Sequence, residues 1–351
     1  MHFAYPPRKN SNAPAFPPRS SRLPVLRRSR TRVLASLGLF VIAVLMLLTR
    51  SHHQSNPWMT LHNEAKNDPN SGSTKSNVAA VAAAGVTTNS FATFNYASSG
   101  KAPTVVIVTV FDETNFHRAY LDTVRDNRKL YAERHGYAAF FPKVGEYDLK
   151  GSPLSWTKVV AMRHALTLFP DSTFFWFVEQ DTFIMNMGAK IESDLMMPTR
   201  LEALMIKDHP VVPPDSIIKT FVHLRGQDVD FVLTQDNDGL STSSFIIRNG
   251  GWARFFFETW FDPIYRSYNF QKAETHALEH IVQWHPTILS KMAIVPQRTI
   301  NAYSKNEHGA VYEPGDLSVR VVACIRTSST ICENEAQSYI KQWQAAARAS
   351  S

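Results

Sequence analysis

Two acidic residues interrupt an apolar run between positions 174 and 186. Glu179 and Asp181 are separated by one residue, and in a strand this spacing directs both carboxylates to the same face. Charged side chains are seldom buried without a partner, so the pair indicates a bound cation or a polar ligand. A divalent metal ion that holds a diphosphate is the candidate that best matches two such carboxylates.

The residues on either side of the acids decide between a core position and a surface turn. In one interpretation the strand ends at Val178, and both acids are solvated loop residues. Apolar segments lie on both sides, at 174–178 and 183–185, and they favour a position within or at the edge of a core element. We therefore expect the acids at the carboxyl end of a central strand, where ligands usually bind in open α/β sheets.

The segments before the acids predict the elements that position them. Residues 104–111 form a continuous β-branched run, typical of a strand that is buried on both faces. A helix at 116–135 that stops at Gly136 and a second strand at 137–141 follow. A second helix at 155–169, with Ser155 as its cap, precedes the acidic strand. This β-α-β-α-β order predicts an α/β fold with a parallel sheet.

Further carboxylates lie in the carboxyl-terminal half. Strands are expected at 231–233 and 243–247, and the loop 234–240 between them contains Asp236 and Asp238. These carboxylates are candidates for orienting sugar hydroxyl groups, with a solvated turn as the alternative. Helices are predicted at 252–260 and 273–282.

The positive charge of the chain is concentrated at the amino terminus. The 351-residue sequence has a formal net charge of +7, but eight Lys and Arg residues and no acids precede residue 33. The formal charge of the chain after residue 32 is therefore 7 − 8, or about −1. No basic, aromatic-rich face is present there, which argues against a nucleic-acid partner.

An uncharged apolar run at 33–49 follows the basic segment and predicts a membrane anchor. Its 17 residues are near the lower limit for a spanning helix. A cleaved signal peptide is the alternative, but residues 47–53 make a poor cleavage site, so an uncleaved anchor is favoured. The charge bias predicts a cytosolic tail at 1–32 and a lumenal chain after the anchor. Residues 50–102 have the composition of a flexible, disordered stem, and 103–345 form the expected lumenal domain. Cys324 and Cys332 lie in this domain, where they either form a disulfide or remain two thiols.

Several short motifs resemble glycosyltransferase family 34 in fungi and plants, especially Golgi α-1,6-mannosyltransferase subunits of mannan polymerase complexes. The resemblance covers about residues 104–324. The matching segments, in order, are 135–137 (His-Gly-Tyr), 156–158 (Trp-Thr-Lys), 179–186 (with Glu-Gln-Asp and Ile-Met-Asn), 244–249 (Ser-Phe-Ile-Ile-Arg-Asn), 295–303 (Val-Pro-Gln-Arg, then Asn-Ala-Tyr) and 315–316 (Gly-Asp, before Cys324).

This resemblance implies a GT-A-like, Rossmann-like nucleotide-sugar transferase domain that retains the anomeric configuration. It implies GDP-mannose as donor, a mannan or N-glycan acceptor, an α-1,6 linkage, and a Golgi membrane protein of type II topology. It also implies a hetero-oligomer with other mannosyltransferase subunits. The open alternatives are an α-galactosyltransferase that uses UDP-galactose and a non-catalytic assembly subunit.

By position, Glu179 and Asp181 take the place of the family's Asp-x-Asp and become the expected Mn²⁺ ligands. Arg320 stands where the family has a metal-binding His, and Arg cannot ligate a cation. We therefore expect one of two arrangements. Either Arg320 pairs with the diphosphate, or the carboxylates, the donor phosphates and water hold the metal ion.

The remaining candidates are less specific. Lys158 and Arg248 are expected to contact donor phosphate or acceptor hydroxyls, with surface or capping roles as the alternative. The expected catalytic residues are therefore Asp181, Asp236 and Arg248, and the expected donor-binding residues are Lys158, Glu179 and Arg320. His308 or His223 is a possible substitute ligand, although a lone histidine is more often structural.

Overall fold

The computed structural model describes residues 102–212, 216–326 and 329–349. The predicted tail, the membrane span at 33–49 and the stem up to residue 101 lie outside these ranges. None of the helices in the described ranges combines the length and apolar character needed to cross a membrane.

The described chain contains a central sheet of six strands in the order β2-β1-β3-β6-β5-β7. Strand β3 lies in its interior, parallel to β1 and antiparallel to β6. The sheet is mixed, because β6 also runs antiparallel to β5, which is parallel to β7. The six strands are β1 (Val105–Val108), β2 (Ala138–Phe140), β3 (Phe174–Val178), β5 (Phe231–Asp236), β6 (Gly239–Arg248) and β7 (Met292–Val295).

A second, smaller sheet adjoins the carboxyl end of β3. It has the order β4-β9-β8 and consists of β4 (Thr182–Ile184), β9 (Ser318–Arg320) and β8 (Ala302–Tyr303). In its register Thr182 pairs with Arg320, and Tyr303 also pairs with Arg320. This sheet therefore places Arg320, from the carboxyl-terminal part of the chain, next to Thr182, the residue that follows Asp181.

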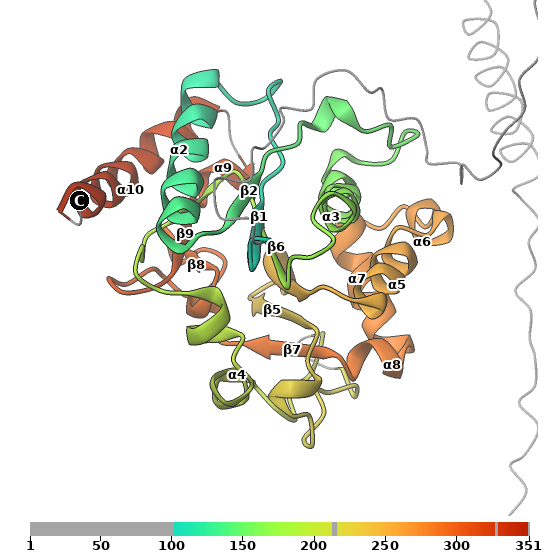
Figure 1. Ribbon diagram of the computed structural model, residues 1–351. Helices are drawn as coiled ribbons and strands as arrows, with labels where there is room; N and C mark the ends of the chain where they lie inside the picture. Colours follow the sequence, from blue (N-terminus) through green and yellow to red (C-terminus); the bar gives the residue numbers. More distant parts are fainter. Residues whose placement is uncertain (1–101, 213–215, 327–328, 350–351) are drawn as a thin grey trace, which may run out of the picture. The chain divides into compact units, whose positions relative to one another are not determined.

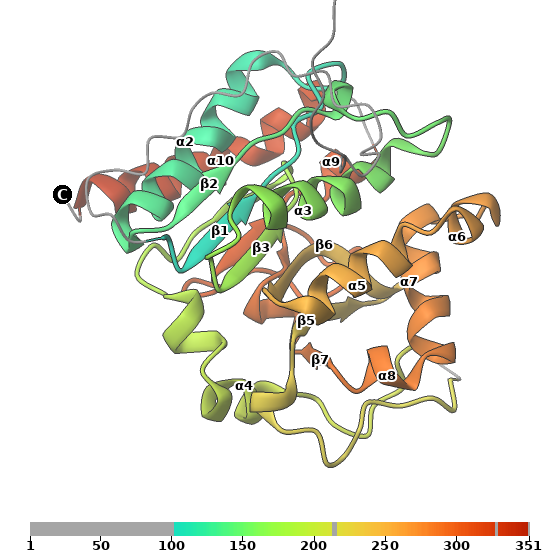
Figure 2. The same ribbon diagram turned by 45° about the vertical axis from the view of Figure 1, so that its right-hand side comes forward.

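Helices cover both faces of the central sheet (Figures 1 and 2). Helices α2 and α10 lie on one face, and α3, α5 and α7 lie on the other. The helices are α2 (Arg118–His135), α3 (Thr157–Leu168), α4 (Pro198–Leu204), α5 (Gly251–Trp260), α6 (Pro263–Ser267), α7 (Ala273–Trp284), α8 (Pro286–Leu289), α9 (Ala323–Arg326) and α10 (Ser329–Ala349).

The two-sided covering explains the uninterrupted apolar sequence of the central strands. In β3, Trp176 and Val178 belong to the core on the α2 side, whereas Phe175 and Phe177 belong to the core on the α3 side. Successive strand residues alternate between faces, so a strand covered on both sides must be apolar at every position.

Most predicted elements are present, and the β-α-β-α-β order of the first half is confirmed. Helix α2 ends at Gly136, whose φ of 68° is a left-handed conformation that glycine adopts without steric cost. The prediction of Ser155 as a helix cap is wrong, because 154–156 form a 3₁₀ turn before α3. The predicted parallel pairing is confirmed for β1, β2 and β3, but the whole sheet is mixed, since β6 is antiparallel to both of its neighbours.

The predicted loop at 234–240 is much shorter than expected. Asp236 is the last residue of β5, and Gly239 begins β6, so only Asn237 and Asp238 connect the two strands. The serine and threonine hydroxyls at the start of β6 are buried, and their polarity gave this strand the appearance of a loop.

Candidate functional site

The two acids lie in a tight turn between the central and the smaller sheet. Strand β3 ends at Val178, and the turn is closed by a hydrogen bond from the Thr182 amide to the Glu179 carbonyl oxygen, at 3.1 Å. Asp181 is buried and Glu179 is partly buried. The acids are therefore not solvated loop residues, and their predicted position at the carboxyl end of a central strand is confirmed.

This acid turn is fixed by backbone contacts from two other elements. The Glu179 amide donates to the Ser243 carbonyl oxygen of β6 at 2.9 Å, and the Val321 amide donates to the Asp181 carbonyl oxygen at 2.8 Å. Because both ends of the turn are tied to sheets, the two carboxylates project from a rigid support.

Helix α2 contributes two buried polar residues that hold the same turn. Arg128 donates from Nη2 to the carbonyl oxygens of Glu179, at 2.9 Å, and Thr182. Asn127 exchanges two hydrogen bonds of 2.9 Å with the backbone of Ile184. Burial lowers the pKa of Arg128 to about 10, which leaves its guanidinium protonated at neutral pH. This buried cation also lies within electrostatic reach of Asp181.

Lys158, on the first turn of α3, bridges two carboxylates. Its Nζ lies 2.7 Å from Oε1 of Glu179 and 2.9 Å from Oε1 of Glu274 on α7, and only 8% of the lysine side chain is exposed. Burial alone would lower the pKa of Lys158, but attraction to the two carboxylates raises it above its ordinary value. Burial would raise the pKa of Glu274, but Lys158 and a hydrogen bond with Ser155 hold it below its ordinary value.

Asp181 forms a second ion pair, with Arg320 of β9. Arg320 Nε donates to Asp181 Oδ2 at 3.0 Å. Burial opposes the charge on Arg320, yet the pKa of the guanidinium is raised, mainly by Asp181. Tyr303 and Glu179 also raise it, so the two ion pairs lie within electrostatic reach of each other. We call the five residues Lys158, Glu179, Asp181, Glu274 and Arg320 the charge cluster.

Asp236, one of the expected catalytic residues, lies at the same end of the sheet as the acids. Its Oδ2 accepts a hydrogen bond of 2.7 Å from the Tyr303 hydroxyl, and Tyr303 is the register partner of Arg320. Burial raises the pKa of Tyr303 to about 12, although Arg320 opposes this shift. Asp236 also lines a cavity of about 400 Å³, together with His209, Gln235, Asn237, Gln297 and Asn306 among others.

Arg248 lies at the opposite end of the sheet, so its expected catalytic role is not supported by the geometry. It is the last residue of β6 and pairs in register with Phe174, whereas Ser244 pairs with Val178 beside the acids. Four residues of strand correspond to about 13 Å. Arg248 instead faces Asp230 at 3.5 Å and stacks over the ring of Phe174.

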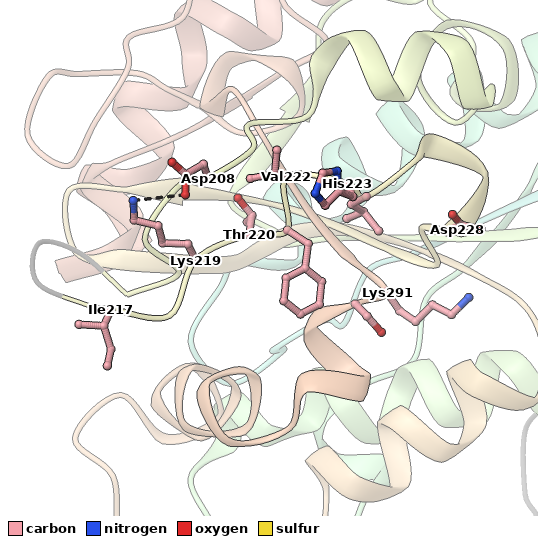
Figure 3. Close-up of a pocket in the computed structure, with 11 residues that line it drawn as sticks. Asp208, Ile217, Lys219, Thr220, Val222, His223, Asp228 and Lys291 are labelled. Atoms are coloured by element: carbon pink, nitrogen blue, oxygen red, sulfur yellow. Dashed lines mark ion pairs between the residues drawn. The ribbon is translucent and has the colours of Figure 1, made fainter. Parts of the chain in front are cut away.

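The two histidines proposed as substitute ligands do not join the acids. Nδ1 of His308 lies 3.5 Å from Asp238 Oδ2. His223 lines a cavity of about 800 Å³ that also includes Lys291, the residue before β7. Figure 3 shows His223 and Lys291 in this cavity with the Lys219 and Asp208 ion pair. Because β7 runs in the direction of β3, this cavity lies near the amino ends of the strands, away from the charge cluster.

The side chains of the charge cluster do not fit a divalent metal ion. Oδ2 of Asp181 is engaged by Arg320, and Oε1 of Glu179 is engaged by Lys158. Within residues 102–212, 216–326 and 329–349, no group of three or more His, Cys, Asp or Glu side chains is arranged to hold a metal. A metal at Asp181 would also lie beside a guanidinium, which repels it. The role of Mn²⁺ stays a prediction that these contacts do not favour.

Two residues that build the site were not among the predicted site residues. Arg128 follows Leu121 and Val124 on the buried stripe of α2, and Glu274 precedes Ala277 and Leu278 on the buried stripe of α7. A charged residue on an apolar helical stripe needs a buried partner. That pattern is the signal by which both residues could have been found.

The two cysteines form a disulfide between Cys324 and Cys332. This bond connects α9, which follows Arg320 and β9, to the first turns of α10. The alternative of two separate thiols is therefore wrong.

Comparison with known proteins gives one family and several distant relatives. A family model described as the galactosyl transferase GMA12/MNN10 family matches residues 101–330. An uncharacterized alpha-1,2-galactosyltransferase of Schizosaccharomyces pombe is 29% identical, over 68% of this chain and 74% of that protein. The probable alpha-1,6-mannosyltransferase MNN11 of Saccharomyces cerevisiae is 29% identical, over 65% of this chain and 60% of that protein.

The solved structures that match show lower similarity. A glycosyltransferase involved in glycosylation of the major capsid of PBCV-1 has 13% identity and a TM-score of 0.46, and the match covers 67% of this chain and 99% of that one. The galactosyltransferase LgtC has 12% identity and a TM-score of 0.35, over 66% of this chain and 95% of that one.

Proposed function

Because the chain belongs to the galactosyl transferase GMA12/MNN10 family of glycosyltransferases, we propose that it transfers mannose from GDP-mannose to a mannan or N-glycan acceptor. The product carries an α-1,6 linkage, and the anomeric configuration is retained. The observation that carries the proposal is the charge cluster at the carboxyl end of β3, because ligands of open α/β sheets bind at the carboxyl ends of the strands. The similarity to MNN11 supports mannose as the transferred sugar.

The reaction breaks the bond between C1 of mannose and the diphosphate and forms a bond from C1 to an acceptor hydroxyl oxygen, whose proton is released. The charge cluster lies where the donor diphosphate would be held. Asp236, in the cavity of about 400 Å³, supplies a carboxylate that can orient acceptor hydroxyls. Lys158 positions Glu179 and Glu274 by bridging them.

We further propose that the protein is a single-span Golgi membrane protein of type II topology, with the apolar run at 33–49 as its anchor and the folded part in the lumen. The disulfide between Cys324 and Cys332 supports an oxidising compartment. We also propose that the protein forms a hetero-oligomer with other mannosyltransferase subunits, because its sequence motifs resemble those of subunits of mannan polymerase complexes.

A donor screen with the full-length chain in detergent tests the proposal. We expect mannose transfer from GDP-mannose to an oligomannose acceptor, and we expect Asp181→Asn to abolish most of it. Asp228→Asn is the matched control, because Asp228 forms an exposed ion pair with Arg225 and its removal should leave the rate unchanged. Equal rates for Asp181→Asn and the wild type would remove Asp181 from the site.

Two other functions are distinguished by the same screen. Transfer from UDP-galactose alone would indicate a galactosyltransferase, which the similarity to the fission yeast relative favours. The ion pair between Asp181 and Arg320 favours a non-catalytic assembly subunit, and this role would be indicated if neither donor were used or bound.

A further inference from the structure

Arg320 occupies one side of the Asp181 carboxylate. Its Nε lies 3.0 Å from Asp181 Oδ2. Its backbone is fixed between two strands, because Arg320 pairs in register with Thr182 and with Tyr303. The guanidinium is therefore held in place by β9 and does not reach the acid from a flexible segment.

The rest of the guanidinium remains able to bind a ligand. In the described part of the chain, Nε is the only nitrogen of this side chain with a hydrogen-bond partner, although a guanidinium carries five N–H donors. The side chain is 18% exposed, so part of it faces solvent. The planar fork of an arginine matches two phosphate oxygens.

Lys158 differs from Arg320 in this respect. Its ammonium group contacts Glu179 and Glu274, and it lies 3.3 Å from the hydroxyl of Thr242. These three contacts use the three N–H donors of a lysine. If Lys158 turned toward a ligand, it would leave a buried Glu274 without its counter-ion. Lys158 is therefore a positioning residue, and Arg320 is the cation of the cluster that has donors to spare.

We propose that the Arg320 guanidinium, and not a divalent metal ion, is the counter-ion of the donor diphosphate, so that this chain binds a nucleoside diphosphate without metal. The inference rests on the proposed function, because it concerns the donor of the same site. Asp181 positions Arg320 by fixing Nε, and the terminal nitrogens bind the phosphate oxygens. When the bond to the sugar breaks, the guanidinium stabilises the negative charge that develops on the leaving diphosphate.

Calorimetric titration of the full-length chain in detergent tests this inference. GDP and UDP are each titrated in excess EDTA and in excess Mn²⁺, and Mn²⁺ is titrated alone. We expect one of the nucleotides to bind in EDTA, with an affinity within about twofold of that in Mn²⁺. We expect no binding of Mn²⁺ alone.

Two variants of Arg320 sharpen the test. Arg320→Gln should lower nucleotide affinity in EDTA by about 10- to 100-fold, because a charged hydrogen-bond donor is lost. Arg320→His removes the guanidinium and adds a ligating nitrogen beside Asp181, so binding should become dependent on Mn²⁺. Arg225→Gln, in the exposed pair with Asp228, is the matched control and should bind as the wild type does.

The outcomes separate the inference from the proposed function. Nucleotide binding by the wild type only in Mn²⁺ would overturn the inference and leave the proposed transferase intact, and this result does not depend on whether a variant folds. Wild-type affinity of Arg320→Gln in EDTA would also overturn the inference. Binding of UDP but not GDP in EDTA would support the inference and contradict GDP-mannose as the donor. Binding of neither nucleotide under either condition would overturn both.

Discussion

The two ends of the central sheet use the same kinds of residue in different surroundings. At the carboxyl end, one lysine bridges two carboxylates, and the exposed fractions are 8% for Lys158 and 4% for Glu274. At the amino end, one carboxylate, Asp230, faces two cations, Arg248 at 3.5 Å and Lys291 at 3.3 Å. The second group is more exposed, and its contacts are longer.

This difference explains why only one end is suited to bind a charged ligand strongly. Solvent screens exposed ion pairs, which contribute little energy, whereas buried charges interact strongly and cannot lose a partner without cost. The larger cavity, of about 800 Å³, lies toward the amino ends of the strands, beside Lys291. Cavity size alone therefore points to the wrong end of the sheet.

The largest expected effect comes from removing the bridging lysine. Lys158→Met leaves Glu179 and the buried Glu274 without their shared counter-ion, and it should lower the free energy of unfolding by about 3 to 5 kcal/mol. Lys291→Met at the other end should cost less than about 1 kcal/mol, because its ion pair is partly exposed and Arg248 remains as a partner of Asp230. Urea unfolding of both variants measures the difference. Equal losses would show that burial does not distinguish the two ends.

The second effect concerns catalysis. Arg320→Gln should lower the rate of sugar transfer by about 100-fold or more, because a positioned positive charge is lost from the leaving group. Arg248→Gln, at the amino end, should leave the rate unchanged. Initial rates at saturating donor and acceptor give the comparison. A larger loss for Arg248→Gln would contradict the location of the site.

A smaller effect is expected in the pH dependence of stability. The pKa of Glu274 is lower in the folded protein than its ordinary value of 4.5. Glu274 therefore stabilises the fold above that pH, and this contribution is lost as the pH falls through the lowered folded-state pKa. Glu274→Gln should flatten the loss of stability in acid, as measured by urea unfolding across this range. An unchanged acid profile would show that Glu274 does not contribute to it.

The smallest effect is expected at the larger cavity. Lys219 forms an exposed ion pair with Asp208 there, so Lys219→Met should change stability by less than about 0.5 kcal/mol. We also expect nucleotide affinity to be unchanged. A clear loss of affinity in this variant would move the donor site to the amino end.

The sequence was sufficient to predict the strands and helices near the acids. Strand β3 and helix α2 carry strong local signals, namely an apolar run in one and helical periodicity with Gly136 as a stop in the other. The acids themselves were found because two charges in an apolar run conflict with burial. Such local conflicts are visible without any knowledge of tertiary structure.

The remaining features depend on contacts between residues far apart in the sequence. The start of β6 resembled a loop because its hydroxyl groups find partners only in the folded chain: Ser241 Oγ accepts a hydrogen bond from Asn301 Nδ2 at 2.9 Å. The pairing of Arg320 with Asp181 spans 139 positions, and it depends on the register of β4 and β9. Because β6 runs antiparallel to β3, Arg248 lies at the end of the sheet opposite to the acids. None of these facts has a local sequence signal.

The most direct test is to locate the bound nucleotide by crystallography of the protein with GDP in the absence of divalent metal. The account predicts the diphosphate at the carboxyl end of β3, with phosphate oxygens within hydrogen-bonding distance of the Arg320 guanidinium. A diphosphate bound beside Lys219 and Lys291 at the other end of the sheet would contradict it.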